Sequence, residues 1–234
     1  MTRRLVLFDI DGTLLHSNGL GRRALGRALA DHLDVPGVVD QVRFDGKTDP
    51  GIVAEVLHAA GVPHPDEPTR IGRILEMYVE HLEEEIAGRS SGPEPRLLPG
   101  VLALLDRLAA ESRVLLGLLT GNVAAGADRK LRAVGLAPSR FAVGAYGSDH
   151  ARRDALPAIA ALRAEPLLGH RPRGDDLIII GDTPADVTCG ASLGARAIGV
   201  ATGSYEASAL EAAGAYRVFS TLEDGDTVCE AILC

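Results

Sequence analysis

Two aspartates separated by a single residue directly follow the first apolar run of the chain. Residues 5–8 of that run predict a strand buried on both faces, with Asp9 and Asp11 where the strand ends. Because side chains alternate along an extended chain, both carboxylates point the same way. Each then raises the energetic cost of ionising the other, unless a cation lies between them. Gly12 and Thr13 then provide a permissive backbone bend. The pattern indicates a cation site, and two solvated aspartates at the start of a turn are the alternative.

A second pair of aspartates follows another apolar run, residues 177–180. Pro184 suits the first turn of a helix, so Asp182 and Asp186 are expected to bracket a helix start at the edge of a sheet. An N-cap role for Asp182 or Thr183 is the alternative, but it leaves Asp186 unexplained. Carboxylates are the hard oxygen ligands that octahedral Mg²⁺ prefers, and no cluster of His and Cys suggests zinc. The donor types therefore favour magnesium.

Polar groups also follow a third apolar run, residues 114–119. Thr120, Gly121 and Asn122 stand where this predicted strand ends and a helix begins. A hydroxyl and backbone N–H groups at a helix N-terminus can hold a phosphate through hydrogen bonds and the helix dipole. The alternative is that Thr120 or Asn122 only caps the helix.

These three runs belong to a regular alternation of predicted strands and helices. Buried strands are predicted at 5–8, 114–119, 177–180 and 197–201, weaker strands at 141–146 and 216–219, and helices near 101–108, 123–134, 156–162 and the C-terminus. Such alternation predicts an α/β fold with a Rossmann-like parallel sheet and helices on both faces. Ligands of this architecture bind beyond the carboxyl ends of the strands, where the polar groups lie.

The stretch between the first strand and the rest of the sheet has a different character. Apolar residues recur there at helical spacing near 25–33, 53–60 and 71–82, without a convincing strand. Residues 88–99 have the Gly, Pro and Ser content of a linker, and the other crossing must lie just after Leu15. The predicted organisation is a core domain of residues 1–16 and 97–234 with an inserted helical domain of residues 17–96. An insertion whose two ends lie close together forms a lid.

Composition and charge limit the classes of molecule that the protein is expected to bind. Of the 234 residues, 46% are hydrophobic, the formal net charge is −8 and the pI is near 5.4, so no basic face for nucleic acid or an anionic membrane is expected. Cys189, Cys229 and Cys234 show no metal-binding spacing, which predicts free thiols and a cytoplasmic location. The early first strand predicts no signal peptide, and no apolar run approaches the roughly 20 residues of a membrane helix. The expected partner is a small phosphorylated metabolite, bound by a monomer or homodimer.

Three of these motifs together resemble those of the haloacid dehalogenase superfamily. Asp-Ile-Asp-Gly-Thr at 9–13 resembles its first motif, Leu-Leu-Thr-Gly-Asn at 118–122 its second, and Gly-Asp-Thr-Pro-Ala-Asp at 181–186 its fourth. The resemblance covers nearly the whole chain and is greatest for the phosphoglycolate phosphatase-like branch. It implies a Rossmann-like core with an inserted helical cap that closes over the active site and reads the substrate.

The resemblance implies a role for each motif residue. Asp9 would be the nucleophile, Asp11 the general acid and base, and Thr120 would bind the transferring phosphoryl group. The implied magnesium ligands are the side chains of Asp9, Asp182 and Asp186 and the backbone carbonyl of Asp11. The residues implied to bind substrate are Gly12, Thr13, Gly46, Lys47, Thr120, Gly121 and Asn122.

The third motif of the superfamily, which normally supplies a catalytic lysine, is altered in this chain. The chain has only two lysines, Lys47 and Lys130, and neither lies in the corresponding region. Arg153 is the expected catalytic replacement and Arg152 the alternative. The exchange is chemically sound, because Arg keeps its charge and can clamp a phosphate with two hydrogen bonds.

The implied activity is that of a magnesium-dependent phosphatase that cleaves a small phosphomonoester, such as 2-phosphoglycolate, through an aspartyl-phosphate. Two-step transfer requires Asp9 and Asp11 to differ in protonation state. Magnesium is therefore expected to keep Asp9 ionised, and a drier position is expected to raise the pKa of Asp11. Asp11 disfavours a metal-free dehalogenase, and a phosphonoacetaldehyde hydrolase would need Lys47 for its Schiff base. Further candidate functions are those of a sugar-phosphate mutase, a phosphorylatable signalling protein and a catalytically silent partner-binding protein.

The loop at 43–50 resembles the substrate-reading loop of this branch. Gly46 would let the backbone approach a ligand, and Thr48 or Asp49 would cap the helix that a proline then starts. Lys47 is expected to pair with the non-reacting end of the substrate, and a solvated loop lysine is the alternative.

Overall fold

The computed structural model describes residues 3–33, 37–88 and 92–234, so residues 89–91 of the predicted linker lie outside the description. The strands of the main sheet are β1 (Arg4–Phe8), β4 (Val114–Leu119), β5 (Val143–Ala145), β6 (Leu177–Gly181), β7 (Arg196–Val200) and β8 (Arg217–Phe219). All neighbours are parallel, in the order β5-β4-β1-β6-β7-β8. Two short strands, β2 (Leu15–His16) and β3 (Arg96–Leu97), form a separate antiparallel pair.

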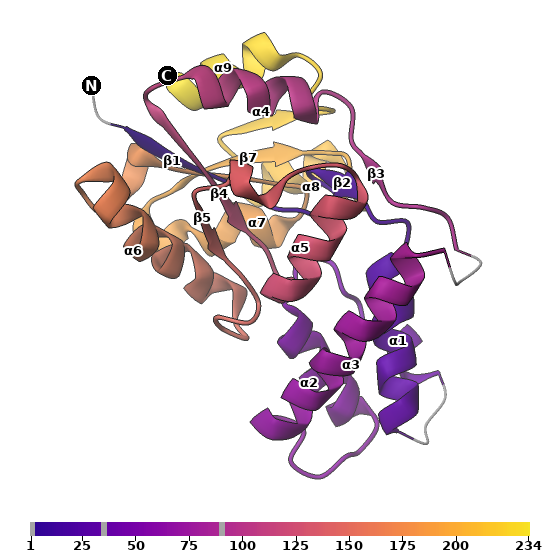
Figure 1. Cartoon of the computed structure of the whole chain (residues 1–234). Coiled ribbons are helices and arrows are strands. Elements are labelled where there is room, and N and C mark those ends of the chain that lie inside the picture. The colour runs from indigo at the N-terminus through magenta and orange to yellow at the C-terminus, as the bar shows by residue number, and fades with distance from the viewer. Residues whose placement is uncertain (1–2, 34–36, 89–91) are drawn as a thin grey trace.

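Helices cover both faces of the sheet and form a second body beside it (Figure 1). The helices are α1 (Leu20–His32), α2 (Asp49–Ala59), α3 (Pro68–Ile86), α4 (Val101–Ala110), α5 (Ala124–Ala133), α6 (Leu156–Leu168), α7 (Pro184–Cys189), α8 (Ala207–Ala212) and α9 (Gly225–Leu233). Leu5 and Leu7 of β1 pack on the side of α6, while Val6 and Phe8 pack on the side of α4, α5 and α9. All four are fully buried, which explains why the run has no polar alternation.

The central position of β1 brings the three polar strand ends together. Leu5 pairs with Leu115 of β4 on one side and with Leu177 of β6 on the other. Since the three strands run parallel, their carboxyl ends meet at one edge of the sheet. The groups that follow these strands therefore share one site.

The helices α1, α2 and α3 have a hydrophobic cluster of their own, which includes Leu25, Val53 and Tyr78. The chain enters and leaves this helical body at the β2–β3 pair, where Leu15 lies opposite Leu97. The predicted crossings at 16/17 and 96/97 thus coincide with this pair, and we propose them as the boundaries of a cap domain.

The predicted α/β fold is confirmed, with differences at the shortest elements. The pair β2–β3 and the helix α8 were not anticipated, because two or six residues carry too little periodicity to predict an element. The predicted strand 141–146 is limited to Val143–Ala145, and Leu33 follows α1 instead of belonging to it. The helix expected after Asp182 is present as α7.

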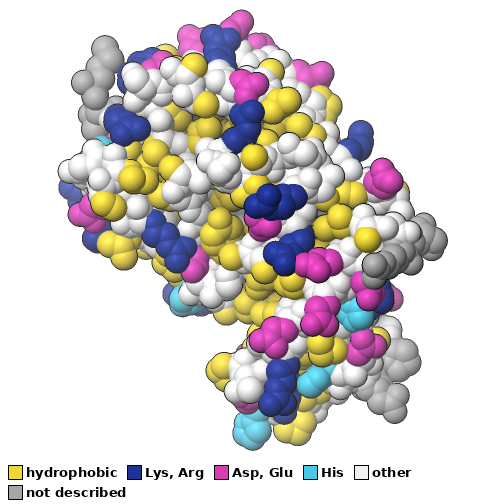
Figure 2. Space-filling model, in the orientation of Figure 1, with side chains coloured by type: hydrophobic (Ala, Val, Ile, Leu, Met, Phe, Trp, Pro, Cys, Tyr) yellow, Lys and Arg dark blue, Asp and Glu magenta, His cyan; other side chains and the backbone are white. Residues whose placement is uncertain are grey.

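The charged side chains of the surface, the apolar character of the helices and the state of the cysteines bear on the expectations drawn from composition. Figure 2 shows basic and acidic side chains intermixed over the face that it draws. Within the described parts of the chain, none of the helices combines the length and apolar character required to cross a bilayer. Cys189, Cys229 and Cys234 are all free thiols.

Candidate active site

A cavity of about 380 Å³ lies between the carboxyl ends of β1, β4 and β6 and the helices α1–α3. Asp9, Thr120 and Arg153 line it on the sheet side, and Arg22 and Tyr78 line it on the helical side. Its volume is near the lower limit for ligand pockets, which suits a small molecule.

Three carboxylates converge at the sheet side of this cavity. Asp9, Asp182 and Asp186 are buried, and each offers an oxygen to a group in which these oxygens lie within 4.8 Å of one another. Burial, with the charges of Asp186 and Asp11, raises the pKa of Asp9 to about 7 although Arg153 opposes this. Burial and the neighbouring carboxylates also raise the pKa of Asp182 well above its ordinary value. Three converging carboxylate oxygens are donors that fit a divalent cation such as Mg²⁺.

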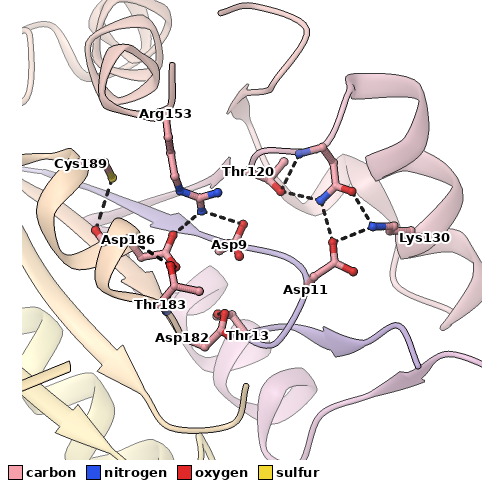
Figure 3. Close-up of polar contacts among 11 residues, drawn as sticks. Asp9, Asp11, Thr13, Thr120, Lys130, Arg153, Asp182, Thr183, Asp186 and Cys189 are labelled. Carbon is pink, nitrogen blue, oxygen red and sulfur yellow. Dashed lines mark hydrogen bonds and ion pairs between the residues drawn. The ribbon is translucent and has the colours of Figure 1, made fainter. Parts of the chain in front are cut away.

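Arg153 is the arginine that the structure brings to these carboxylates (Figure 3). It begins the short helical turn Arg153–Ala155 ahead of α6, and its Nη2 lies 3.1 Å from Asp9 Oδ1 and forms an ion pair with Asp186. Burial alone would lower the pKa of Arg153, but these two carboxylates hold it above its ordinary value. The side chain of Arg152 is 74% exposed and lies near Asp154 instead.

Local hydrogen bonds hold the carboxylates in place. The Thr13 hydroxyl donates to Asp182 Oδ1 over 3.1 Å. Thr183 is the N-cap of α7, and Asp186 completes a capping box by accepting from both the Thr183 hydroxyl (2.6 Å) and its backbone N–H (3.1 Å). Gly12 has a φ of +82°, and a Cβ there would overlap the Asp182 carboxylate. The N-cap alternative for Thr183 is therefore correct, and it accounts for Asp186 as well.

The Asp11 side chain points toward Lys130 of α5 and not toward the three carboxylates (Figure 3). Its Oδ2 accepts from Lys130 Nζ and from Asn122 Nδ2, each over 2.8 Å. Burial alone would raise the pKa of Asp11, but the charge of Lys130 and the hydrogen bonds from Lys130, Asn122 and Ser17 together outweigh burial and hold that pKa below its ordinary value. The expected upward shift was wrong because this buried cation was not anticipated.

Thr120 directly follows β4, and Asn122 aligns its hydroxyl. Its Oγ1 accepts from Asn122 Nδ2 over 2.7 Å and from the Asn122 backbone N–H over 3.3 Å. Since both contacts use the hydroxyl as acceptor, its proton is left to donate to an incoming oxygen. Neither residue caps α5, whose N-cap is Val123.

The loop at 43–50 lies against the carboxyl ends of the strands. The Asp49 N–H donates to the Gly121 carbonyl over 2.7 Å, and the Val123 N–H donates to Asp49 Oδ2 over 2.8 Å. A Cβ on Gly121 would overlap the Lys47 carbonyl. The two backbones approach so closely that only glycine fits, and the loop closes one side of the cavity.

Within this loop, Thr48 and not Asp49 caps α2, since its Oγ1 accepts from the Gly51 N–H over 3.1 Å. Gly46 has a φ of +72°, and a Cβ there would press on Ala185 at the start of α7. Lys47 lines the cavity, but its ammonium forms an ion pair with Glu55 of α2. Its contact with substrate stays a prediction.

Sequence reasoning missed the role of Lys130, Asp49 and Tyr78 in the site, and it did not identify Arg22 at all. Lys130 was noted only for lying outside the third motif, Asp49 only as a cap, and Tyr78 only as an apolar position of a helix. One signal was available for Lys130, because it is one of two lysines in a chain that otherwise uses arginine. The contact of Tyr78 with this lysine depends on how α3 packs against α5, which no local pattern reveals.

Comparisons with known proteins agree with this geometry. A family model described as haloacid dehalogenase-like hydrolase matches residues 3–194. A Rhodospirillum rubrum protein named phosphoglycolate phosphatase is 30% identical over 226 residues, which cover 92% of this chain and 86% of that protein.

Solved structures share the fold. A hydrolase from Pseudomonas syringae has a TM-score of 0.76 at 22% identity, with both chains covered completely. CbbY from Rhodobacter sphaeroides, solved in complex with phosphate, has a TM-score of 0.69 at 21% identity, covering 95% of this chain and 96% of that one. A predicted phosphoglycolate phosphatase from Haemophilus somnus has a TM-score of 0.70 at 18% identity, with coverages of 98% and 99%.

Proposed function

Because the chain belongs to the haloacid dehalogenase-like hydrolase family and is a phosphatase similar to phosphoglycolate phosphatase, we propose that it hydrolyses a small phosphomonoester in two steps. Asp9 acts as nucleophile, and Asp11 acts as general acid and then as general base. The observation that carries this proposal is the convergence of Asp9, Arg153 and Thr120 at the carboxyl edge of the sheet. Beside them lies a cluster of three carboxylates that could bind a cation.

In the first step, an Asp9 carboxylate oxygen attacks phosphorus, and the bond from phosphorus to the ester oxygen breaks. The departing oxygen takes a proton from the Asp11 carboxyl group. The phosphate dianion that enters between Asp9 and Thr120 adds negative charge near Asp11, which raises the Asp11 pKa and favours the protonated form. Arg153 and the Thr120 hydroxyl donate to the oxygens of the transferring group.

In the second step, water attacks phosphorus of the aspartyl-phosphate. Asp11, ionised after the first step, takes a proton from that water, and the bond between phosphorus and the Asp9 oxygen breaks. Inorganic phosphate leaves, and Asp9 and Asp11 return to their starting states. Lys130 and Asn122 suit this role of Asp11, because they stabilise its ionised form.

The residues that would hold Mg²⁺ are Asp9, Asp182 and Asp186, and the Asp11 backbone carbonyl is the further ligand that we propose. When bound, Mg²⁺ supplies positive charge against the oxygens of the transferring group. The Arg153 guanidinium supplies one further cation at the same carboxylates.

We propose 2-phosphoglycolate as the first substrate to test, because a relative named phosphoglycolate phosphatase matches nearly the whole chain. The small cavity and the cationic side chains of Arg22 and Lys47 on its helical side support a small, anionic ester. Lys47 would have to exchange its ion pair with Glu55 for the substrate.

The test measures phosphate release from a panel of small phosphate esters, with Mg²⁺ or with excess chelator. Activity is expected only with Mg²⁺, and Asp9→Asn should abolish it. Asp66→Asn, which neutralises an exposed carboxylate on the helical body, is the matched control and should keep full activity. Full activity in chelator would contradict the metal assignment, and near-normal turnover by Asp9→Asn would contradict the nucleophile.

A further inference from the structure

Lys130 joins the second aspartate of the site to the helical body. Its side chain is only 5% exposed, and its Nζ donates to Asp11 Oδ2 over 2.8 Å and to Asn122 Oδ1 over 2.6 Å. The Tyr78 hydroxyl of α3 lies beside the same ammonium and interacts with it electrostatically. Gly21 of α1 also approaches it, because a Cβ there would lie 3.1 Å from Nζ. The ammonium thus lies between the sheet-bearing core and two helices of the other body.

We propose that Lys130 is a positioning residue that orients the Asp11 carboxylate for proton transfer, and that Tyr78 makes this orientation depend on the docking of α3. The proposal rests on the phosphatase mechanism given above. Lys130 does not replace the lysine of the altered third motif, since Arg153 contacts the nucleophile and Lys130 contacts only the acid–base side.

A purely structural role explains these contacts poorly. Burying an ion pair gains little over well-packed apolar side chains, and such replacements are often neutral or stabilising. α5 already has an apolar anchor, because Ala127 and Leu131 pack into the core on either side of Lys130. The ion pair also fixes the orientation of the Asp11 carboxylate, since two donors from different residues converge on its Oδ2.

The position of the helical body then affects the chemistry. Tyr78 is 1% exposed and belongs to the hydrophobic cluster of α1–α3, so its hydroxyl moves with that cluster. If α1 and α3 move away from α5, the ammonium loses its Tyr78 partner and becomes accessible to water. Asp11 is then held by groups that are free to rearrange, and proton transfer is efficient only when the helical body is docked.

The test uses the dependence of the first step on the leaving group. Phenyl phosphate releases a strongly basic phenolate that needs a proton, whereas 2,4-dinitrophenyl phosphate releases a weakly basic anion that does not. The ratio kcat/KM reports only the steps up to the first irreversible one. A defect in acid catalysis therefore lowers kcat/KM for the first ester far more than for the second.

For Lys130→Met we expect kcat/KM with phenyl phosphate to fall by roughly 30- to 100-fold, within the range for general acid catalysis, and by less than about threefold with the dinitrophenyl ester. With that ester the variant should also show a burst of dinitrophenolate equal to the enzyme concentration, because base-assisted hydrolysis of the aspartyl-phosphate is slowed. Arg132→Met removes an exposed cation from the same helix and should change neither value.

Tyr78→Phe keeps the ring in place and removes only the hydroxyl. It therefore tests the coupling between the docking of α3 and proton transfer by Asp11, even if Lys130→Met does not fold. We expect a loss of roughly 3- to 10-fold on phenyl phosphate alone, the effect of removing one polar contact of hydrogen-bond strength, and no further loss when Tyr78→Phe is added to Lys130→Met. Equal losses on both esters, or losses that add in the double variant, would overturn the proposal while leaving the phosphatase assignment intact. A wild-type protein inactive on both esters with Mg²⁺ would overturn the phosphatase mechanism itself and the proposal with it.

Discussion

Neutralising Asp9, the nucleophile that we propose, should stabilise the metal-free protein, and should do so more at high pH than at low pH. Burial raises the pKa of Asp9 from its ordinary value of 3.8 to about 7, so the folded state holds a proton that the unfolded chain has already released. The stability contributed by this proton is complete below pH 4 and is lost as the pH rises to 7. Asp9→Asn removes this loss because an amide does not ionise.

The magnitude follows from the proton balance. Between pH 5 and 7 the unfolded chain has lost the Asp9 proton and the folded chain keeps it, so the free energy of unfolding falls by about 1.4 kcal/mol per pH unit from this group. Relative to the wild type, Asp9→Asn should therefore gain up to about 3 kcal/mol between pH 5 and pH 8. For a chain of this length the gain corresponds to roughly 6–12 °C in Tm.

The assay is urea unfolding followed by circular dichroism, in excess chelator, at pH 5 and at pH 8. The quantity of interest is the change with pH in the difference between variant and wild type, because it cancels any effect of the substitution that does not depend on pH. Asp66→Asn, at an exposed position of the helical body, is measured in parallel as the control for a general effect of an Asp-to-Asn exchange. Parallel curves for wild type and Asp9→Asn would refute the argument that Asp9 holds its proton to about pH 7.

Magnesium at a hundred times its Kd should raise the free energy of unfolding of the wild type by about 2.7 kcal/mol, and Asp182→Asn should lose most of this gain in thermal unfolding; an undiminished gain would remove Asp182 from the metal site. Lys47→Ala should lower kcat/KM for 2-phosphoglycolate by roughly ten- to a hundredfold, the worth of a charge-assisted hydrogen bond, and leave 4-nitrophenyl phosphate nearly unaffected. Equal losses on the two esters would assign Lys47 to the support of its loop. Gly121→Ala should raise KM for both esters and speed proteolysis at 43–50, because its Cβ would overlap the Lys47 carbonyl; a variant indistinguishable from wild type would contradict the docked position of that loop.

The residues that sequence reasoning identified are those whose signal is local. Asp9, Thr120 and Asp182 each follow a buried parallel strand, and the alternation of elements is enough to bring such strand ends to one edge. Thr48 could be expected as a cap, because a proline two residues later marks the helix start. The fold was predictable for the same reason, since each long strand and helix has its own periodicity.

What could not be predicted depends on contacts between distant parts of the chain. The pKa of Asp11 was expected to rise because burial alone was considered, whereas polar partners distant in the sequence lower it, above all Lys130, which lies 119 residues away along the chain. Asp49 was expected only as a cap, but its side chain accepts from the Val123 N–H across the boundary between the two bodies. Such contacts require the relative placement of packed helices, which no window of sequence contains.

The β2–β3 pair has a consequence for how such proteins diversify. Since both crossings are tied together by two paired residues on each side, the chain passes between the sheet and the helical body at a single place. A different inserted segment needs only two ends with the spacing of paired strands, and the exchange replaces none of Asp9, Asp182 and Asp186, which all belong to the sheet-bearing part of the chain. The three clustered carboxylates and the groups that surround the rest of the substrate can therefore change separately, provided that the new segment again places a partner beside Lys130, which makes this joint the natural place to graft a new substrate preference.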